Sequence, residues 1–319
     1  MLHVFVGGII ALLAGTAAAQ GYPAKPIRFI VPFPPGGGTD IVARTVATKL
    51  TETKKWAIVL ENKPGAGGNL GIEQAVKSPP DGYTMVIGQT SNLAINPTLH
   101  RNLSYDPLRD LAPVALMVSA PIILVTSDKR PFKSVAEVVA AAKAKPGQLS
   151  YASPGNGTVA HLTAELFQRA AGIQLSHIPY KGASQAMTDL MGGQVDLYLS
   201  SVPSAIAQIK GGKLRALAVT GAKRSAELPE VPAIAESGYK GFEVTTWYGL
   251  LLPAGTPEPI VKLLNGEVNQ VLRLPEVRSR LAAEGGDVLG GTPGEFAAVL
   301  KADLARWGGI VKQSGAKVD

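Results

Sequence analysis

The sequence predicts an α/β protein in which short strands alternate with helices. Apolar runs are each followed by a Gly- or Pro-rich turn, and then by a stretch whose apolar residues recur at helical spacing. The chain of 319 residues contains 36 Gly and 24 Pro but only 6% aromatic residues, and this composition favours many short elements. Its length fits one large or two ordinary domains.

The first third of the chain repeats a unit of strand, turn and helix. The apolar run 25–32 precedes a Gly-rich turn and a helix from about Thr39, in which apolar residues recur at near-helical spacing. The same order follows in residues 57–76, and residues 83–88 are a third predicted strand. Strands that alternate with helices at this spacing predict parallel α/β layers.

The middle of the chain predicts a second sheet with helices of its own. Ser134-Val-Ala-Glu137 is a capping box that opens a helix ending near Lys145, and Gly172 ends the helix that begins at Thr158. We expect strands at residues 149–152, 176–179, 195–199 and 214–219, with intervening helices that end at Gly192 and Gly211.

The order changes in the last part of the chain. Residues 242–252 predict a strand, and helices begin near Pro257, Pro275 and Thr292. The last helix start is well marked, because Thr292 can cap it, Pro suits its first position and Glu295 its third. Since these terminal helices need a sheet to cover, we expect the C-terminus to return to the first sheet.

The N-terminus is expected to be an export signal. Residues 4–14 are apolar and uncharged, and Ala17-Ala18-Ala19 gives the small-residue pattern at which signal peptidase cleaves, so we expect cleavage after Ala19. The residues before the apolar run include no Lys or Arg, which leaves open a misassigned start codon. A transmembrane anchor is the alternative, but a span needs about 20 apolar residues and this run is interrupted too early.

Composition excludes several classes of protein. The chain has no cysteine, so it has no disulfide scaffold, thiolate metal site, cysteine nucleophile or lipid-modified cysteine. Its 31 Lys+Arg and 24 Asp+Glu give a net charge of +7, but no run of basic residues resembles a nucleic-acid-binding arm. We interpret the charge as a bias toward anionic small molecules, with no nucleic-acid partner.

A Gly-rich loop, residues 33–40, follows the first predicted strand. Successive glycines let backbone N–H groups converge, and the helix N-terminus behind them carries about half a positive charge, so the loop is expected to bind an anion. The alternative is a tight turn capped by Thr39 or Asp40. No Gly-Lys-Ser/Thr follows, so the loop is not a P-loop. The candidate ligand-binding residues are Phe33, Pro35, Gly36, Gly37 and Asp40.

A second Gly-rich loop, residues 153–158, again joins a strand to a helix. Gly155, Gly157 and Ala160 match a dinucleotide fingerprint, but Lys181 stands where an acidic residue should hold the ribose of NAD. Lys181 would suit a 2′-phosphate, yet an exported protein rarely meets nicotinamide cofactors, and we predict no cofactor. The candidates are Ser153, Gly155, Asn156, Gly157 and Thr158, together with His161, for which a hydrogen-bonded packing role is the alternative.

Polar residues follow two other predicted strands. Gln89, Thr90 and Ser91 come after one strand, and Ser200 and Ser201 come after the other. Hydroxyls and amides at these places can donate to a carboxylate without a buried charge that must be neutralised. We expect them to select the ligand; simple solvation of the loops is the alternative.

Signals for catalysis and metal binding are weak. The four His residues show no zinc-binding spacing, and no Gly-x-Ser-x-Gly elbow occurs. We therefore predict no catalytic residue and no metal site. The three Trp residues are assigned to packing, with Trp247 also considered as a residue that lines a cleft.

Eight motifs occur in an order that is typical of one family. They are KPIRFIVPFPPGGGTD (25–40), ENKPGAGG (61–68), PDGYT (80–84), YASPGNGT (151–158) with His161-Leu162, PYKG (179–182), GGQV (192–195), RALAVT (215–220) and PAGTP (253–257). On these motifs the chain resembles the Bug, or TctC-type, family, the extracytoplasmic solute receptors of tripartite tricarboxylate transporters. The resemblance covers essentially the whole mature chain.

The resemblance implies a two-lobed, type II-like periplasmic-binding-protein fold whose lobes close about a hinge. The first lobe would comprise residues 20–121 and 246–319, and the second lobe residues 122–245. Backbone N–H groups of the loops 33–40 and 153–158, one from each lobe, would hold a carboxylate or similar group, with bridging waters. The chain departs from many relatives at Pro35 and Gly38 in the first loop, which bears on the ligand that fits, and at Lys54-Lys55-Trp56, which replaces the usual Gly-Gln and lies away from the cleft.

We therefore expect a monomeric periplasmic receptor, not an enzyme, that captures a small organic anion and delivers it to integral-membrane subunits of the TctA and TctB type. Two alternatives remain open. One is an exported enzyme that acts on carboxylates, with His161 and Asp40 as its candidate bases; the other is a receptor that signals to a membrane sensor. The ligand remains open among a dicarboxylate, a tricarboxylate, an aromatic acid and an amide.

Overall fold

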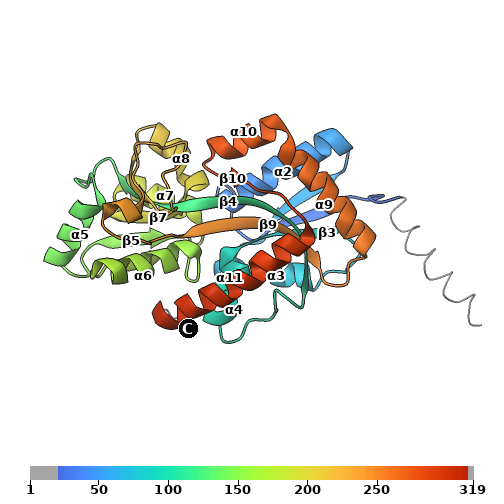
Figure 1. Ribbon diagram of the computed structural model, residues 1–319, viewed down its shortest axis with the longest axis horizontal. Coiled ribbons are helices and arrows are strands. Elements are labelled where there is room, and N and C mark those ends of the chain that lie inside the picture. The colour runs from blue at the N-terminus through green and yellow to red at the C-terminus, as the bar shows by residue number, and fades with distance from the viewer. Residues whose placement is uncertain (1–20, 315–319) are drawn as a thin grey trace, which may run out of the picture.

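The computed structural model describes residues 21–314, which form two lobes joined by one sheet (Figure 1). Its ten strands follow the order β2-β1-β3-β9-β4-β7-β5-β6, with β8 and β10 paired to β4. Strand β1 is parallel to β2 and β3, and β5 is parallel to β6 and β7, whereas β4 and β9 run antiparallel to their neighbours. The predicted α/β class is confirmed. The predicted export signal, residues 1–19, lies outside the described residues.

The first lobe is built from the two ends of the chain. Its sheet order is β2-β1-β3-β9, followed by the first part of β4. From the N-terminal side it takes β1 (Ile27–Val31), α2 (Gly38–Lys54), β2 (Ile58–Asn62), η1 (Ala66–Gly68), α3 (Asn69–Val76), β3 (Thr84–Gln89), η2 (Ser91–Ile95) and α4 (Asn96–Leu99). From the C-terminal side it takes β9 (Thr245–Pro253), α9 (Glu258–Arg273), α10 (Pro275–Ala283), β10 (Asp287–Val288) and α11 (Pro293–Ser314).

The second lobe is continuous in sequence. Its strands surround the second part of β4, with β8 on one side and β7, β5 and β6 on the other. Its elements are α5 (Val135–Ala144), β5 (Ser150–Ser153), α6 (Val159–Ala171), β6 (Ser176–Pro179), α7 (Ala183–Gly192), β7 (Leu197–Ser201), α8 (Val202–Lys210), β8 (Leu214–Val219) and η3 (Ile234–Ser237).

One long strand, β4 (Leu111–Ser127), passes from the first lobe into the second (Figure 1). Its residues 111–121 pair with β9, and its residues from Ile122 onward pair with β7 and β8. The expectation of two separate sheets is therefore wrong, because this strand hydrogen-bonds to both sets of neighbours. Strand β4 itself and the short helical segments η2 and α4 were not predicted from the sequence.

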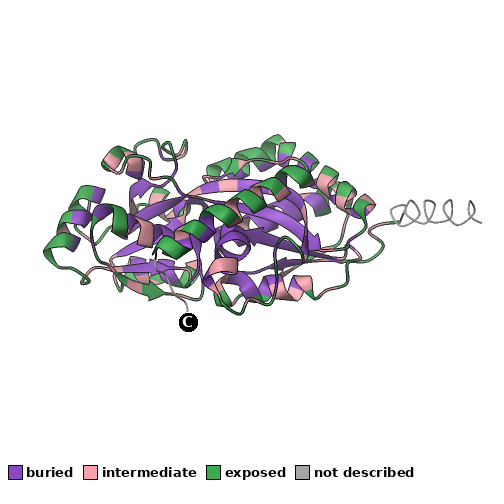
Figure 2. Ribbon diagram, turned by 60° about the horizontal axis from the view of Figure 1, so that its bottom comes forward, coloured by how far each residue is buried: buried purple, intermediate pink, exposed green. Residues whose placement is uncertain are grey.

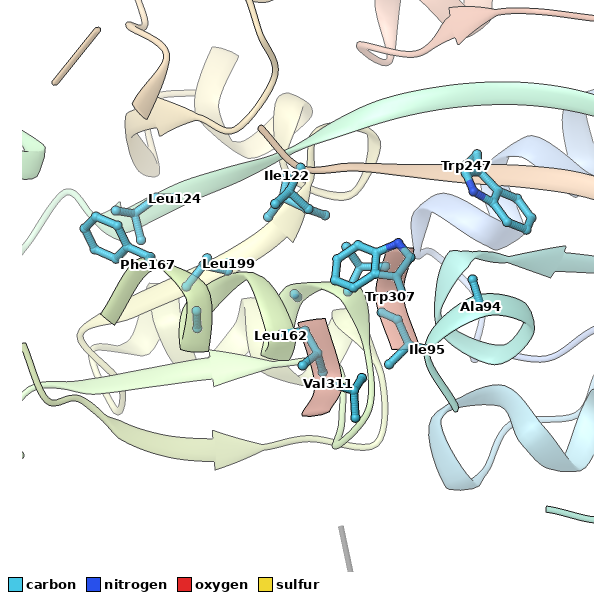
Figure 3. Packing of buried hydrophobic residues seen from close by; sticks show 14 of the residues in the cluster. Ala94, Ile95, Ile122, Leu124, Leu162, Phe167, Leu199, Trp247, Trp307 and Val311 are labelled. Carbon is cyan, nitrogen blue, oxygen red and sulfur yellow. The ribbon is translucent and has the colours of Figure 1, made fainter. Parts of the chain in front are cut away.

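The helices cover both faces of the sheet, whose strands are mostly buried (Figure 2). One apolar cluster lies under α2, α9 and α10 in the first lobe, and another lies under α7 and α8 in the second. A third cluster extends beneath both lobes, where Trp307 of α11 is almost completely buried beside Ile95 and Leu162 (Figure 3). Helix α11 therefore contributes to the core of both lobes.

Helix caps explain why the predicted helix starts agree with the structure. Ser134 Oγ accepts the N–H of Glu137 at 3.2 Å, although the Glu137 carboxylate accepts from Lys133 N–H instead of closing the box on Ser134. At α11 the box is reciprocal: Thr292 Oγ1 accepts from Glu295 N–H, and Glu295 Oε2 accepts from Thr292 N–H at 2.7 Å. Each bond satisfies an N–H that the first turn of a helix leaves without a partner.

Two properties of residues 21–314 bear on function. No helix in this range combines the length and the apolar character needed to cross a membrane. The same residues contain no group of three or more His, Asp or Glu side chains that could hold a metal ion.

Candidate ligand-binding site between the lobes

The loops that follow the parallel strands of the two lobes face one another. In the first lobe they follow β1, β2 and β3; in the second they follow β5, β6 and β7. We call β3 and β7 the hinge-side strands of the first and the second lobe. Strand β3 lies next to β9, and β7 lies next to β4. Open α/β sheets bind ligands at the carboxyl ends of their strands, so this interface is the candidate site.

A cavity of about 50 Å³, here called the inner cavity, lies between the lobes and is bordered by β4 and β9. Six of the residues proposed from sequence line it: Phe33, Gly37, Gln89, Ser91, Thr158 and Ser201. Several other lining residues were not proposed from the sequence, including Gly38, Thr39, Ile122, Ser204, Thr246 and Tyr248.

Four helices begin at the wall of the inner cavity. Helices α2, α6, α7 and α8 contribute Gly38, Val159, Ala183 and Ser204, all within their first turns. Among the described residues that line this cavity, none carries a charged side chain. Helix N-termini present unpaired N–H groups and a partial positive charge, so the cavity favours an anion held by uncharged donors.

Tyr248 places a phenol at the back of the inner cavity. Its side chain is almost completely buried, and burial raises the pKa of Tyr248 to about 12, against which bonds to Ser201 and Thr246 act more weakly. The phenol therefore stays protonated at neutral pH and can donate a hydrogen bond. The neighbouring Trp247 points to the other face of β9, where its ring meets Phe296 edge-on at 5.5 Å and its Nε1 donates to Asp303. Trp247 thus packs in the core instead of lining the cleft.

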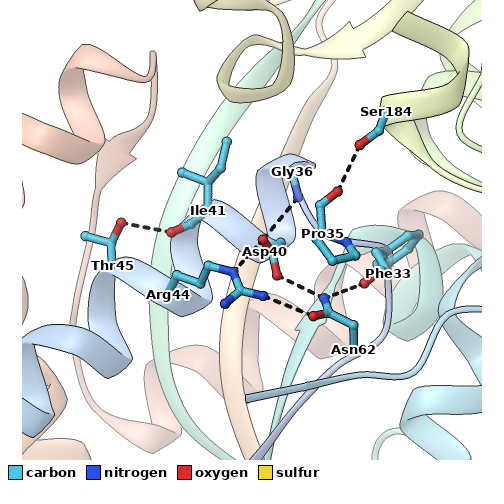
Figure 4. Close-up of polar contacts among 9 residues, drawn as sticks. All are labelled: Phe33, Pro35, Gly36, Asp40, Ile41, Arg44, Thr45, Asn62 and Ser184. Carbon is cyan, nitrogen blue, oxygen red and sulfur yellow. Dashed lines mark hydrogen bonds and ion pairs between the residues drawn. The ribbon is translucent and has the colours of Figure 1, made fainter. Parts of the chain in front are cut away.

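The loop of the first lobe, residues 33–38, is held by the carboxylate of Asp40 (Figure 4). This carboxylate accepts from Gly36 N–H at 3.1 Å, from Arg44 Nε at 2.7 Å and from Asn62 Nδ2 at 2.9 Å. Asn62 also donates to the carbonyl of Phe33 at 2.8 Å. Burial opposes ionisation of Asp40, but the hydrogen bonds from Arg44, Asn62 and Gly36 outweigh it and lower the pKa. Asp40 therefore shapes the loop and does not line the inner cavity.

The loop of the second lobe, residues 153–158, is held by neutral side chains. His161 Nδ1 accepts from Gly157 N–H at 3.3 Å, and His177 Nε2 lies 2.7 Å from Ser153 Oγ. The two imidazoles stack at 4.3 Å, and His177 also stacks on Tyr151 at 4.6 Å. Burial lowers the pKa of His161, and burial with the neighbouring His161 lowers the pKa of His177 to about 3. Both rings are therefore uncharged at neutral pH.

The other residues proposed from sequence lie near the inner cavity without lining it. Thr90 Oγ1 accepts from Trp247 N–H at 3.0 Å, and Ser200 is buried within β7. Pro35 accepts at its carbonyl from Ser184 Oγ of the opposite lobe at 2.8 Å (Figure 4). Gly155 and Asn156 line a second cavity.

This second cavity, here called the outer cavity, has a volume of about 650 Å³ and lies at the mouth of the cleft. It is lined by loops of the outermost strands, at residues 64–68 and 179–181, together with Pro154, Gly155 and Asn156. Phe33, Pro34 and Pro154 line both cavities and so form the partition between them.

The missed lining residues give weak signals in sequence. Ser204 lies in the first turn of the helix that follows β7, three residues after Ser201. The reason for choosing Ser201, that ligands bind beyond the carboxyl ends of parallel strands, therefore applied to Ser204 as well. Tyr248 could be found only by choosing which face of β9 meets the cleft, because successive strand residues point to opposite faces.

Comparison with known proteins agrees with the resemblance seen in the motifs. Residues 42–316 match the family model TctC, described as the tripartite tricarboxylate transporter family receptor. Among curated proteins, Protein BugT of Bordetella pertussis is 39% identical, over 98% of this chain and 97% of its own length.

Solved structures share the fold over nearly all of this chain. The structure of R. palustris Rpa4515 with adipate superposes with a TM-score of 0.91 at 34% identity, covering 93% of this chain and 100% of that one. The structure of the periplasmic binding protein BugD gives a TM-score of 0.89 at 36% identity, covering 93% of this chain and 99% of that one. The expected two-lobed periplasmic-binding-protein fold is confirmed.

Proposed function

This chain belongs to the family of tripartite tricarboxylate transporter receptors, and on that premise we propose that it captures a small organic carboxylate between its lobes and delivers it to a membrane transporter. The observation that carries the proposal is the inner cavity, where four helices begin and the lining side chains are uncharged. A carboxylate is small enough for this cavity, and the helix N-termini neutralise its charge. The adipate-bound relative supports the same ligand class.

In this proposal the carboxylate joins the lobes. Backbone N–H groups of the loops 33–40 and 153–158 approach it from opposite sides, and Gln89, Ser201 and Tyr248 donate from the hinge side. The ligand favours the closed state only by the contacts that it gains there. Asp40 and His161 act indirectly, since each holds the shape of one loop. Thr90 and Ser153 also act indirectly, since Thr90 Oγ1 accepts from Trp247 N–H and Ser153 Oγ contacts His177 Nε2.

The two cavities suggest how a whole ligand is accommodated. The inner cavity, about 50 Å³, matches a carboxylate and little more, whereas the outer cavity, about 650 Å³, lies in the usual range of ligand pockets. We propose that the carboxylate enters the inner cavity and that a larger ligand extends past Phe33 and Pro154 toward the mouth.

We propose that the lobes divide at residues 121/122 and 245/246, with the hinge in β4 and β9. The change of pairing partners between Pro121 and Ile122 supports the first division, because a strand can bend where its neighbours change. The start of β9 at Thr245 supports the second division.

We propose a location in the periplasm, after removal of residues 1–19, and action as a monomer with membrane subunits of the TctA and TctB type. The family description and the periplasmic relative BugD support this location. We also propose that the protein is a receptor and not an enzyme. The candidate bases, Asp40 and His161, are already engaged in holding their loops, which supports that choice.

Calorimetric titration of the wild-type protein and the Gly38→Ala variant with a panel of mono-, di- and tricarboxylates tests the proposal. A Cβ at Gly38 would come within 2.6 Å of the Tyr248 hydroxyl and 2.8 Å of Ser201 Oγ, so we expect at least about tenfold weaker binding. Gly266→Ala is the matched control, because this helical glycine has open space around it. Wild-type protein that binds none of the panel, or equal binding by Gly38→Ala, would contradict the proposal.

A further inference from the structure

We infer that Ser91 and Ser204 are paired positioning residues, each of which caps the binding helix of the opposite lobe when the cleft closes. Ser204 Oγ, in the second lobe, accepts from Gly38 N–H of α2 in the first lobe at 2.8 Å. Ser91 Oγ, in the first lobe, accepts from Val159 N–H of α6 in the second lobe at 3.1 Å. In both pairs the donor is the first residue of the helix.

The two bonds occupy equivalent places in the two lobes. Helices α2 and α6 follow β1 and β5, and each serine follows the adjacent hinge-side strand, β3 or β7. Each lobe therefore provides one serine and receives one. Because both bonds cross the cleft, they exist only while the lobes are together.

Helix capping explains why these bonds favour closure. The first N–H groups of a helix have no partner within the helix and need an acceptor from elsewhere. Within residues 21–314, Gly37 provides no side-chain cap for α2, and in α6 the Thr158 hydroxyl caps the N–H of His161, which leaves that of Val159. The crossing serines supply the acceptors, whereas in an open cleft these N–H groups face water. A typical neutral hydrogen bond of this kind changes a closing equilibrium by roughly fivefold.

Ser204 can reach α2 because the facing residue is a glycine. The φ angle of Gly38 is not in the left-handed region, so the requirement at this position is steric. A side chain there would meet Ser201 Oγ at 2.8 Å, and Ser201 Oγ in turn lies 3.0 Å from Ser204 Oγ. The close approach of α2 to this pair of hydroxyls is therefore built into the sequence.

The two serines would set ligand affinity without being selective for the ligand. The apparent dissociation constant varies inversely with the fraction of molecules in the closed, binding-competent state. This part of the inference rests on the proposed function; the closing equilibrium does not. It also gives Ser91 a different role from the ligand-selecting role expected from the sequence.

The closing equilibrium can be measured without ligand. The chain has no cysteine, so Val59→Cys in β2 and Ile178→Cys in β6 give a spin-label pair at the two outer edges of the sheet, where both residues are exposed. Distance distributions would be recorded for this protein and for derivatives with Ser91→Ala, Ser204→Ala or both. We expect each change to raise the ratio of open to closed molecules about fivefold, and the double change to raise it about 25-fold.

Two further variants separate this role from a general structural one. Ser204→Thr keeps the hydroxyl and should restore the wild-type distances. Ser78→Ala removes a hydroxyl of the first lobe that donates to Gln74 O in the preceding helix α3 at 2.9 Å and does not cross the cleft, so it should leave the distances unchanged. An unchanged distance distribution in the double alanine variant would overturn the inference.

Titration with the tightest carboxylate of the panel completes the test. We expect up to about fivefold weaker binding for each alanine change, with the full factor when open molecules predominate without ligand. Weaker binding with unchanged distances would also overturn the inference, because the serines would then act on the ligand and not on closure. If wild-type protein bound no carboxylate, the proposed function would fail, while the distance measurement would still decide the role of the serines.

Discussion

The two Gly-rich loops at the cleft are supported in different ways, one by charge and the other by neutral rings. In the first lobe the carboxylate of Asp40 joins Gly36, Arg44 and Asn62. In the second lobe the imidazoles of His161 and His177 take that place. A loop of fixed shape at a helix N-terminus can thus be obtained with either kind of support, but the two respond differently to acid.

The sign of each pKa shift defines a pH window. The pKa of Asp40 is lower in the folded protein than in the unfolded chain, where it is about 3.9. Its contribution to stability is therefore complete above about pH 4 and is lost as the pH falls through the folded-state pKa. The pKa of His177 is also lowered, to about 3, but from an unfolded value near 6.5. Its contribution therefore begins to decrease below about pH 6.5. Acid should weaken the loop of the second lobe first.

The largest expected effect comes from removing the charged support. Asp40→Ala leaves Arg44, Asn62 and the N–H of Gly36 without their acceptor, and we expect it to lower the free energy of unfolding by about 2–3 kcal/mol. Asp40→Asn keeps an acceptor oxygen and should cost less. Urea denaturation at pH 7 measures both values. A loss below about 0.5 kcal/mol for the alanine variant would show that the carboxylate does not hold the loop.

A moderate effect is expected from acid on the neutral support. Between pH 6.5 and 5 we expect the free energy of unfolding to fall by roughly 2 kcal/mol, because His177, and to a lesser extent His161, take up protons more readily in the unfolded chain. His177→Phe keeps a ring between His161 and Tyr151 but cannot titrate, so its stability should depend less on pH. Urea denaturation across this pH range compares the two proteins. Equal pH dependence of stability in the wild type and His177→Phe would show that His177 does not cause the loss.

The smallest effect is expected from removing the cation of the charged support. Arg44 is half-exposed, and Asp40 keeps two other donors, so Arg44→Gln should cost only about 0.5 kcal/mol. Lys262→Gln is a matched control, because Lys262 pairs with Glu258 at the same i,i+4 spacing but both side chains are largely exposed. We expect almost no change in the control. A larger loss of stability for Lys262→Gln than for Arg44→Gln would contradict the expectation that the pair with the buried carboxylate of Asp40 is the stronger one.

Local sequence signals accounted for most elements of this fold. The ranges of β6 and β8 agree with the prediction, because Pro and Gly mark their ends. The missed strand β4 is apolar over most of its length and contains Pro113 and Pro121, so neither alternation nor turn residues mark it. Its irregular register near Pro113 shows how the sheet tolerates a residue that cannot donate a ladder hydrogen bond.

The candidate site was predictable where it depends on local backbone. The two Gly-rich loops could be recognised because glycine turns before helices are visible in the chain itself. Ser204 and Tyr248 could not be placed in the same way, since they reach the inner cavity through the packing of one lobe on the other. The support by His177 was likewise hidden, because its partner Ser153 belongs to a neighbouring strand.

The pairing of β3 with β9 has a consequence for the order of folding. Val86 pairs with Leu251, so the sheet of the first lobe stays incomplete until most of the chain is available. The parallel strands β5, β6 and β7 of the second lobe lie close together in sequence. Contacts between distant residues form more slowly, so we expect the second lobe to nucleate and the first lobe to close around it last. For the periplasmic location proposed above, such late completion would let the chain cross the membrane before its first lobe folds.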